Sequence, residues 1–190
     1  MDRRGEILTA AGCLFREHGY HATSMRDIAK HMGMRGSSLY AHVTSKEEML
    51  WELVSRAADA FLRQARSVAG DLPPRQRLKV LIRGHLTVIV QELPNATVFF
   101  HEWKFLSDEH RARVIAWRDA YENTFRDAIA DGKRQGAFDV ADVKVAAIYI
   151  LSALNWTYQW YRVQGELSLD ALIDHYTQLS WRVVGAEEES

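Results

Sequence analysis

Proline is almost absent from this chain, and that absence restricts the fold more than any other feature of the sequence. The only prolines are Pro73, Pro74 and Pro94, so long segments can stay helical without interruption. Along those segments apolar residues recur at the spacing of an amphipathic helix, and no alternating pattern typical of strands is present. The sequence therefore predicts an all-α protein of about nine helices.

The composition is that of an ordinary globular protein, long enough for one domain or two small ones. Of 190 residues, 47% are hydrophobic and 26% are charged. No apolar run reaches the roughly 18 residues that a membrane-spanning helix needs, and the N-terminus lacks the pattern of a secretory signal. A single cysteine, Cys13, excludes a disulfide framework and a CxxC zinc site. We therefore expect a cytoplasmic protein.

The first fifty residues contain two short helices separated by a glycine turn. The segment Ser24–Asp27 has the spacing of a capping box and begins a two-turn helix, which Gly33 ends. A very short helix over about 35–42 follows, and Ser45–Glu48 has the spacing of a second capping box at the start of a long fourth helix. Two short helices across a tight turn are the signature of a helix-turn-helix motif.

The segment 35–42 has the chemistry of a DNA-reading helix more than that of a core helix. Leu39 is its only sizeable aliphatic residue, and Gly36–Ser38 are small enough for the backbone to approach DNA closely. The guanidinium of Arg35 can donate two hydrogen bonds to one guanine. On pattern alone, a glycine-broken corner on a solvated face remains an equal alternative. The candidate DNA-binding residues are Arg26, Arg35, Gly36, Ser37, Ser38, Tyr40, His42 and Lys46.

The charge of the chain points to a small basic footprint. The formal net charge is −1, yet the segment from Arg26 to Lys46 carries four basic residues and one acidic residue. Tyr40 and His42 offer polar tips suited to phosphate, and Lys46 lies at a helix N-terminus, which favours an anion. We therefore expect operator binding with a modest salt dependence, and no general affinity for polyanions.

An ordered set of residues between positions 7 and 50 resembles the DNA-binding domain of the tetracycline-repressor (TetR) family of bacterial regulators. The matching residues are Ile7, Leu8, Ala10, Ala11, Leu14, Phe15, Gly19, Tyr20, Thr23, Ser24, Arg26, Asp27, Ile28, Ala29, Gly33, Ser38, Leu39, Tyr40, His42, Val43, Ser45, Lys46, Glu47, Glu48, Met49 and Leu50. The resemblance implies a helix-turn-helix DNA-binding domain over 1–47, whose third helix enters the major groove, and a helical ligand-binding and dimerisation domain over 48–190. Family members often carry lysine where this chain has Gly36, so operator preference is not transferable.

The resemblance also implies a ligand pocket in the C-terminal helices, and two aromatic clusters are the candidates to line it. These residues are Phe99, Phe100, Trp103, Trp117, Tyr121, Trp156 and Trp160. A weaker resemblance, carried by Phe99–Ser107 and Asn155–Tyr161, is to regulators of fatty-acid, sterol and aromatic-acid catabolism that respond to acyl-coenzyme A thioesters. Arginines that could meet the phosphates of such an effector are Arg111, Arg113, Arg118 and Arg162.

The last helix carries one apolar stripe that suits a two-fold dimer. Pairing of the last two helices would make a four-helix bundle and would place two DNA-reading helices to read a palindrome. The stripe consists of Leu172, Ile173, Tyr176, Leu179 and Val183.

Other function classes find little support in the residues. No catalytic constellation or phosphate-binding glycine loop is present, and the eight histidines show no metal-ligand spacing, so we expect no enzyme, no metal and no cofactor other than an effector. Two alternatives on the same fold stay open. One is a DNA-binding protein that needs no ligand, and the other is a multidrug-responsive repressor with an apolar ligand other than a CoA thioester.

Overall fold

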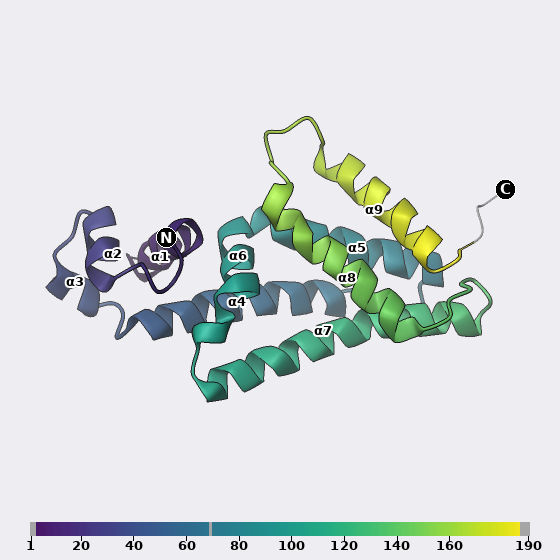
Figure 1. Ribbon diagram of the computed structural model, residues 1–190, viewed down its shortest axis with the longest axis horizontal. Helices are drawn as coiled ribbons and strands as arrows, with labels where there is room; N and C mark the ends of the chain where they lie inside the picture. The colour runs from purple at the N-terminus through teal and green to yellow at the C-terminus, as the bar shows by residue number, and fades with distance from the viewer. Residues whose placement is uncertain (1–2, 69, 187–190) are drawn as a thin grey trace. The chain divides into compact units, whose positions relative to one another are not determined.

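A computed structural model describes residues 3–68 and 70–186, and this part of the chain is helical without strands (Figure 1). The expectation of an all-α protein with nine helices is confirmed, with one short 3₁₀ helix in addition. The elements are α1 (Arg3–His18), α2 (Met25–His31), α3 (Gly36–Tyr40), α4 (Lys46–Arg66), α5 (Pro74–Gln91), α6 (Leu93–His101), η1 (Trp103–Phe105), α7 (Asp108–Arg134), α8 (Val143–Trp160) and α9 (Leu169–Val183).

The chain divides into two compact units. The first unit comprises Met1–Asp59 and Glu92–Ala116, and the second comprises Ala60–Gln91 and Trp117–Ser190. The first unit contains all of the segment 1–47 expected to bind DNA. Two of the divisions fall inside α4 and α7, so each of these helices contributes residues to both units, and the third falls between α5 and α6.

The first unit forms around the apolar faces of its short helices. Ile7 and Phe15 of α1, Ile28 of α2 and Leu39 of α3 are fully buried. Helix α1 packs against α2 and α6, and α2 packs against α3. The helix-turn-helix therefore shares its core with the segment that follows α5 in sequence.

Helix α2 begins and ends as its sequence predicts. The Ser24 Oγ accepts a hydrogen bond from the backbone N–H of Asp27 at 3.2 Å, and the Asp27 carboxylate accepts one from the N–H of Ser24 at 2.9 Å. This is the reciprocal capping box. After α2, Gly33 has a φ of +63°, which glycine adopts at no steric cost. The chain can therefore turn sharply and begin α3 three residues later.

The second unit is built on helix α5. Helices α8 and α9 both pack against α5 and against each other (Figure 1). Its core includes Leu78, Ile82 and Ile89 of α5, Phe125 of α7 and Leu154 of α8. Side-chain N-caps begin both C-terminal helices, with Asp142 accepting from the Val145 N–H and Ser168 from the Ala171 N–H.

Candidate DNA-binding surface and effector-binding residues

Helix α3 is anchored in the core by one side chain, and its other side chains are exposed to solvent. Leu39 is fully buried, whereas Arg35, Ser37 and Ser38 are exposed and Tyr40 is 57% exposed. The helix spans Gly36–Tyr40, somewhat shorter than the 35–42 expected from the sequence. One guanidinium, two hydroxyls and a phenol therefore lie on an open surface of the kind that can contact base edges and phosphates.

The other candidate DNA-binding residues flank this surface. Arg26 on α2 and His42 after α3 are also exposed, and so is Gly36 at the start of α3. Nothing in the open space around Gly36 would meet an added Cβ within 4 Å. The small size of Gly36 is therefore not required by packing inside the chain, which is consistent with a surface that a partner approaches.

Lys46 uses two of its three N–H donors in hydrogen bonds within the protein. Its Nζ donates to the carbonyl oxygens of Tyr20 and Thr23, each at 2.8 Å, and lies 4.3 Å from the centre of the Tyr20 ring. Burial lowers the pKa of the Lys46 ammonium. Because an ammonium has three N–H donors, one remains for a phosphate. The structure thus gives Lys46 a role in fixing the turn before α2 that the sequence did not reveal.

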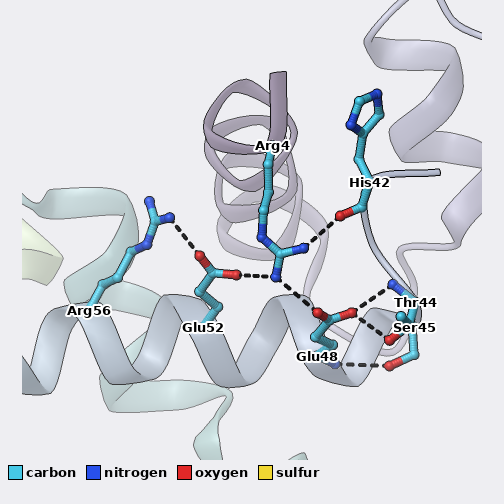
Figure 2. Close-up of polar contacts among 7 residues, drawn as sticks. All are labelled: Arg4, His42, Thr44, Ser45, Glu48, Glu52 and Arg56. Carbon is cyan, nitrogen blue, oxygen red and sulfur yellow. Dashed lines mark hydrogen bonds and ion pairs between the residues drawn. The ribbon is translucent and has the colours of Figure 1, made fainter. Parts of the chain in front are cut away.

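Arg4 joins three segments of the first unit in what we call the Arg4 network (Figure 2). Its Nη1 donates to the carbonyl oxygen of His42 at 2.6 Å. Its Nη2 lies 2.9 Å from Glu48 Oε1 and 2.7 Å from Glu52 Oε2. Glu52 also pairs with Arg56 at 2.6 Å. The first turn of α1 is therefore tied both to His42, at the end of the candidate DNA-reading segment 35–42, and to α4.

Glu48 connects the Arg4 network to the loop before α4. Its Oε2 accepts hydrogen bonds from the backbone N–H of Thr44 at 2.6 Å and from the Thr44 hydroxyl. The bond from the Thr44 hydroxyl, then the bond from Arg4 and then that from the Thr44 N–H lower the pKa of Glu48 to about 2. The predicted capping box is half formed, because the Glu48 N–H donates to Ser45 Oγ while the carboxylate binds Thr44 instead of the Ser45 N–H.

A segment distant in sequence packs on the helix-turn-helix turn. The Tyr20 N–H donates to Glu102 Oε2 at 3.1 Å, and the ring of Phe105 stacks on that of Tyr20 with centres 5.9 Å apart. Nearby, the Ser107 N–H donates to Glu47 Oε1 at 2.9 Å. The segment between α6 and α7 therefore has polar and aromatic contacts with the turn before α2 and with the start of α4.

The residues expected to line a ligand pocket fall in both units. In the first unit Phe99 is buried and Phe100 and Trp103 are half-buried. In the second unit Tyr121 is buried and Trp117 is half-buried. The remaining two lie on the solvent-exposed side of α8, with exposed fractions of 61% for Trp156 and 46% for Trp160. Within the second unit, Tyr121 is thus the candidate with an interior position.

The four candidate anion-binding arginines have different surroundings. Arg111 donates to the Leu106 carbonyl oxygen at 3.0 Å and pairs with Asp108. The guanidinium of Arg113 lies 4.9 Å from the centre of the Trp51 ring. Burial lowers the pKa of Arg118, and Arg162 donates to the backbone carbonyl oxygens at the end of α8. The first two belong to the first unit and the last two to the second, so the structure does not describe them as one cluster.

The stripe predicted for a dimer interface has a buried part and an open part. Leu172 and Ile173 are buried in the second unit, Tyr176 and Val183 are half-buried, and Leu179 is 56% exposed. The open part borders a hollow of about 330 Å³ between α8 and α9. The hollow is lined by Tyr149, Ile150, Ala153, Tyr176, Leu179, Ser180, Arg182 and Val183.

Comparison with protein families assigns both parts of the chain. Residues 7–53 match the family of bacterial regulatory proteins called tetR, and residues 71–184 match the tetracyclin repressor-like C-terminal domain. The chain belongs to the TetR family. The resemblance noted in the sequence is thereby confirmed, and this TetR protein is a DNA-binding transcriptional regulator with an N-terminal helix-turn-helix and a C-terminal helical domain.

Individual relatives of this TetR chain include regulators of known name and structure. The transcriptional repressor KstR2 of Mycobacterium tuberculosis H37Rv is 31% identical over 178 residues, which cover 92% of this chain and 88% of the relative. A tetR-family regulatory protein from Rhodococcus RHA1 superimposes with a TM-score of 0.91 at 25% identity, over 99% of this chain and all of the other. The regulator AibR, solved with isovaleryl coenzyme A and operator DNA, superimposes with a TM-score of 0.84 at 26% identity, over 98% of this chain and all of AibR.

Two further observations concern the described part of this TetR chain. Within residues 3–68 and 70–186, no cluster of three or more histidine, cysteine or acidic side chains is placed to hold a metal ion. Over the same residues, none of the helices combines the length and the hydropathy needed to cross a membrane.

Proposed function

We propose that this TetR-family protein is a homodimeric repressor that binds a palindromic operator and leaves it when a small apolar effector of the acyl-CoA class binds. The observation that carries the DNA-binding half of the proposal is the open surface of α3, where only Leu39 of five helical residues is buried. Such a protein works by binding and without catalysis, in the cytoplasm where its operator lies. The relatives named as repressors support the direction of regulation.

A second copy of this chain is the partner that suits the α8–α9 face. Helix α8 exposes Val145, Tyr149, Trp156 and Trp160 at exposed fractions of 46–63%, and α9 adds Leu179 at 56%. Exposed aromatic side chains in such number are costly in water and are typical of an interface that a partner covers. A two-fold dimer through this face is isologous, so each copy covers the apolar surface of the other.

The dimer has a direct test in sedimentation velocity on the purified chain. Leu179→Glu puts a charge on the exposed apolar face and should shift the protein from dimer to monomer at micromolar concentration. Gln178→Glu adds the same charge at the neighbouring exposed position of α9 and should leave the dimer intact. A wild-type chain that sediments as a monomer, or a dimer that persists in Leu179→Glu, contradicts this assembly.

The effector class rests on similarity and on the interior of the second unit. AibR, which superimposes over nearly the whole chain, was solved with isovaleryl coenzyme A. In this chain the second unit provides buried aromatic side chains, Tyr121 among them, that suit an acyl chain. The candidate arginines Arg118 and Arg162 of the same unit offer charge for the phosphates of coenzyme A.

Release from DNA requires the effector to distinguish two states of the protein. Helix α4 is continuous from Lys46, beside the DNA-reading segment, to Arg66 in the second unit, and it is the element through which we propose the two units communicate. The effector must bind the DNA-incompetent state more tightly, or it shifts nothing. By linkage, operator DNA must weaken effector binding by the same factor.

This reciprocity supplies the experiment. The operator is first identified by selection from random DNA, and binding is measured by fluorescence anisotropy with and without a series of acyl-CoA thioesters. Calorimetric titration then measures the affinity of the active thioester for the free protein and for the protein saturated with operator. An effector affinity that operator DNA leaves unchanged refutes release by this effector. Tight operator binding with no response to any thioester, followed by a response to cationic or aromatic drugs, would support a multidrug-responsive repressor instead.

A further inference from the structure

The interior of the second unit contains one buried histidine among aromatic side chains. His85 lies in the middle of α5 and is 1% exposed. Its ring is surrounded by those of Phe61, Tyr121 and Phe125, with ring centres 4.9, 5.7 and 6.5 Å away. Polar side chains are rarely placed at the centre of such an aromatic cluster, because desolvation is costly unless each polar atom has a partner.

Only one of the two ring nitrogens of His85 has a partner. Its Nδ1 lies 3.1 Å from the hydroxyl oxygen of Tyr121. Its Nε2 is buried and has no hydrogen-bond partner in the described part of the chain. Burial lowers the pKa of His85 to about 3 and raises that of Tyr121, so both groups are neutral at physiological pH. The pair is therefore an uncharged polar site in an apolar interior.

Hydrogen-bond accounting indicates which nitrogen carries the proton. If the Tyr121 hydroxyl donates to Nδ1, the hydroxyl proton is satisfied and the proton of the ring lies on Nε2, leaving one unmet donor. In the other tautomer Nδ1–H donates to the phenol oxygen. The hydroxyl proton and the Nε2 lone pair then both lack partners among the described residues. The first arrangement leaves fewer groups unmet, so Nε2 presents an N–H.

We propose that His85 Nε2–H, held in this tautomer by Tyr121, donates a hydrogen bond to an uncharged oxygen of the effector inside the second unit. The inference rests on the proposed function and narrows it, because it names the chemistry of the buried end of the ligand. A keto or thioester carbonyl oxygen, or a hydroxyl, satisfies the N–H.

A free carboxylate does not suit this place. The buried side chains with polar atoms in the described second unit are His85, Thr157, Thr177 and Ser180 together with the tyrosines Tyr121, Tyr158 and Tyr161, none of which carries a permanent charge. A buried anion without a paired cation is far costlier than a buried carbonyl. The buried portion of the effector therefore carries its oxygen in an uncharged form, as in a thioester.

Three CoA derivatives test which oxygen of the effector accepts the hydrogen bond from His85. Octanoyl-CoA carries the thioester carbonyl, S-octyl-CoA is the thioether that lacks it, and 3-oxooctanoyl-CoA adds a second carbonyl on the chain. Affinities are measured by calorimetry for the wild type and for His85→Phe, which keeps an aromatic ring and removes the N–H. His85→Gln retains an N–H at similar reach and should recover part of the affinity. Thr177→Val is the matched control, because it removes another buried oxygen without a partner, on α9.

The expected result is a loss that depends on the ligand oxygen. His85→Phe should weaken binding of the carbonyl-bearing probe by about 3- to 10-fold, the usual range for one neutral hydrogen bond, and that of the thioether by less than about twofold. A selective loss for 3-oxooctanoyl-CoA assigns the bond to the chain oxygen, and a loss shared with octanoyl-CoA assigns it to the thioester. Equal losses for all three probes, no loss, or the same loss in Thr177→Val overturn the proposal.

NMR of the His85 imidazole tests the proposed hydrogen bond even if the effector is not an acyl-CoA. In the wild type, the imidazole ¹⁵N resonances of His85 should show Nε2 protonated and Nδ1 accepting, and the Nε2 resonance should move when the carbonyl probe binds. If no CoA derivative binds at all, the acyl-CoA proposal fails, and 2-octanone then serves as the oxygen-bearing probe with 1-octene as its apolar match. A shift with 2-octanone alone upholds the subsite. No shift with any oxygen-bearing probe overturns it.

Discussion

The Arg4 network offers a sharp test of how the helix-turn-helix is held to the rest of its unit. In Arg4→Ala the carbonyl of His42 loses its donor, and Glu48 and Glu52 lose a shared cation. The variant should be less stable than the wild type. It should also bind operator more weakly, because the backbone that follows α3 is no longer fastened to α1.

The magnitude follows from the environment of Glu48. Lowering its pKa from 4.5 to about 2 corresponds to roughly 3 kcal/mol at neutral pH if nothing is discounted. The Glu48 side chain is 30% exposed, and solvent screening at such a site reduces this to about 1–2 kcal/mol. The Thr44 hydroxyl is the largest cause of the lowered pKa and Arg4 the second, so Arg4→Ala removes only part of it. Including the bonds to Glu52 and His42, the total loss should be about 1–3 kcal/mol.

Urea unfolding followed by circular dichroism at pH 7, 5, 4 and 3 measures this loss. A carboxyl whose pKa is lowered by folding stabilises fully above 4.5, and this contribution is lost as the pH falls towards 2. The difference between wild type and Arg4→Ala should therefore be constant from pH 7 to 5 and shrink below about 4.5. His85 also destabilises the fold on acidification, since its pKa is lowered to about 3, but it is present in both proteins and cancels in the difference.

The neighbouring arginine provides the control. Arg3 pairs with Glu6 at 2.7 Å, but the two side chains are 45% and 39% exposed, so Arg3→Ala should cost less than about 0.5 kcal/mol. Similar losses in Arg3→Ala and Arg4→Ala would refute the reasoning from burial. A difference that stays undiminished down to pH 3 would refute the assigned role of Glu48.

The remaining predictions concern single substitutions at four positions. Lys46→Met keeps the aliphatic stem but removes the donors to the two carbonyls of the turn before α2, and should lower the unfolding free energy by about 1–3 kcal/mol, measured by urea titration. Arg35→Ala should relax base preference at one operator position by about 1–3 kcal/mol, whereas Tyr40→Phe should weaken binding to all sequences alike. If Arg35→Ala weakens binding to every DNA sequence equally in an anisotropy assay, Arg35 contacts phosphate and does not read a base. Gly132→Ala should destabilise the second unit by about 1–3 kcal/mol despite the better helix propensity of alanine, because the added Cβ would overlap the ring of Phe138. A higher melting temperature would contradict this.

Features set by neighbouring residues were predictable from the sequence. The capping box of Ser24 and Asp27 is formed, the turn at Gly33 ends α2, and α3 and the start of α4 lie close to where the local motifs indicated. These depend on contacts within four residues, which a linear pattern contains. The family followed from the same local motifs.

Interactions between distant residues were not predictable. Arg4 binds partners 38, 44 and 48 positions away, and nothing near it in sequence indicates them. The place of Lys46 at a helix N-terminus predicts a phosphate contact, but the carbonyls that it binds come from a turn more than twenty residues earlier. Nothing near His85 in the sequence distinguishes it from the apolar residues of α5, and the lack of a partner for its Nε2 depends on the aromatic rings that the fold places around it.

The anchoring of α3 by a single residue has a consequence for evolution. Leu39 alone is buried, so substitutions at Arg35, Ser37, Ser38 and Tyr40 disturb no packing within the chain. Surface substitutions of this kind usually change stability by less than about 0.5 kcal/mol. The positions that we expect to contact DNA can therefore mutate with little effect on folding. A lineage can acquire a new operator sequence through changes at these positions without first accumulating mutations that compensate for lost stability.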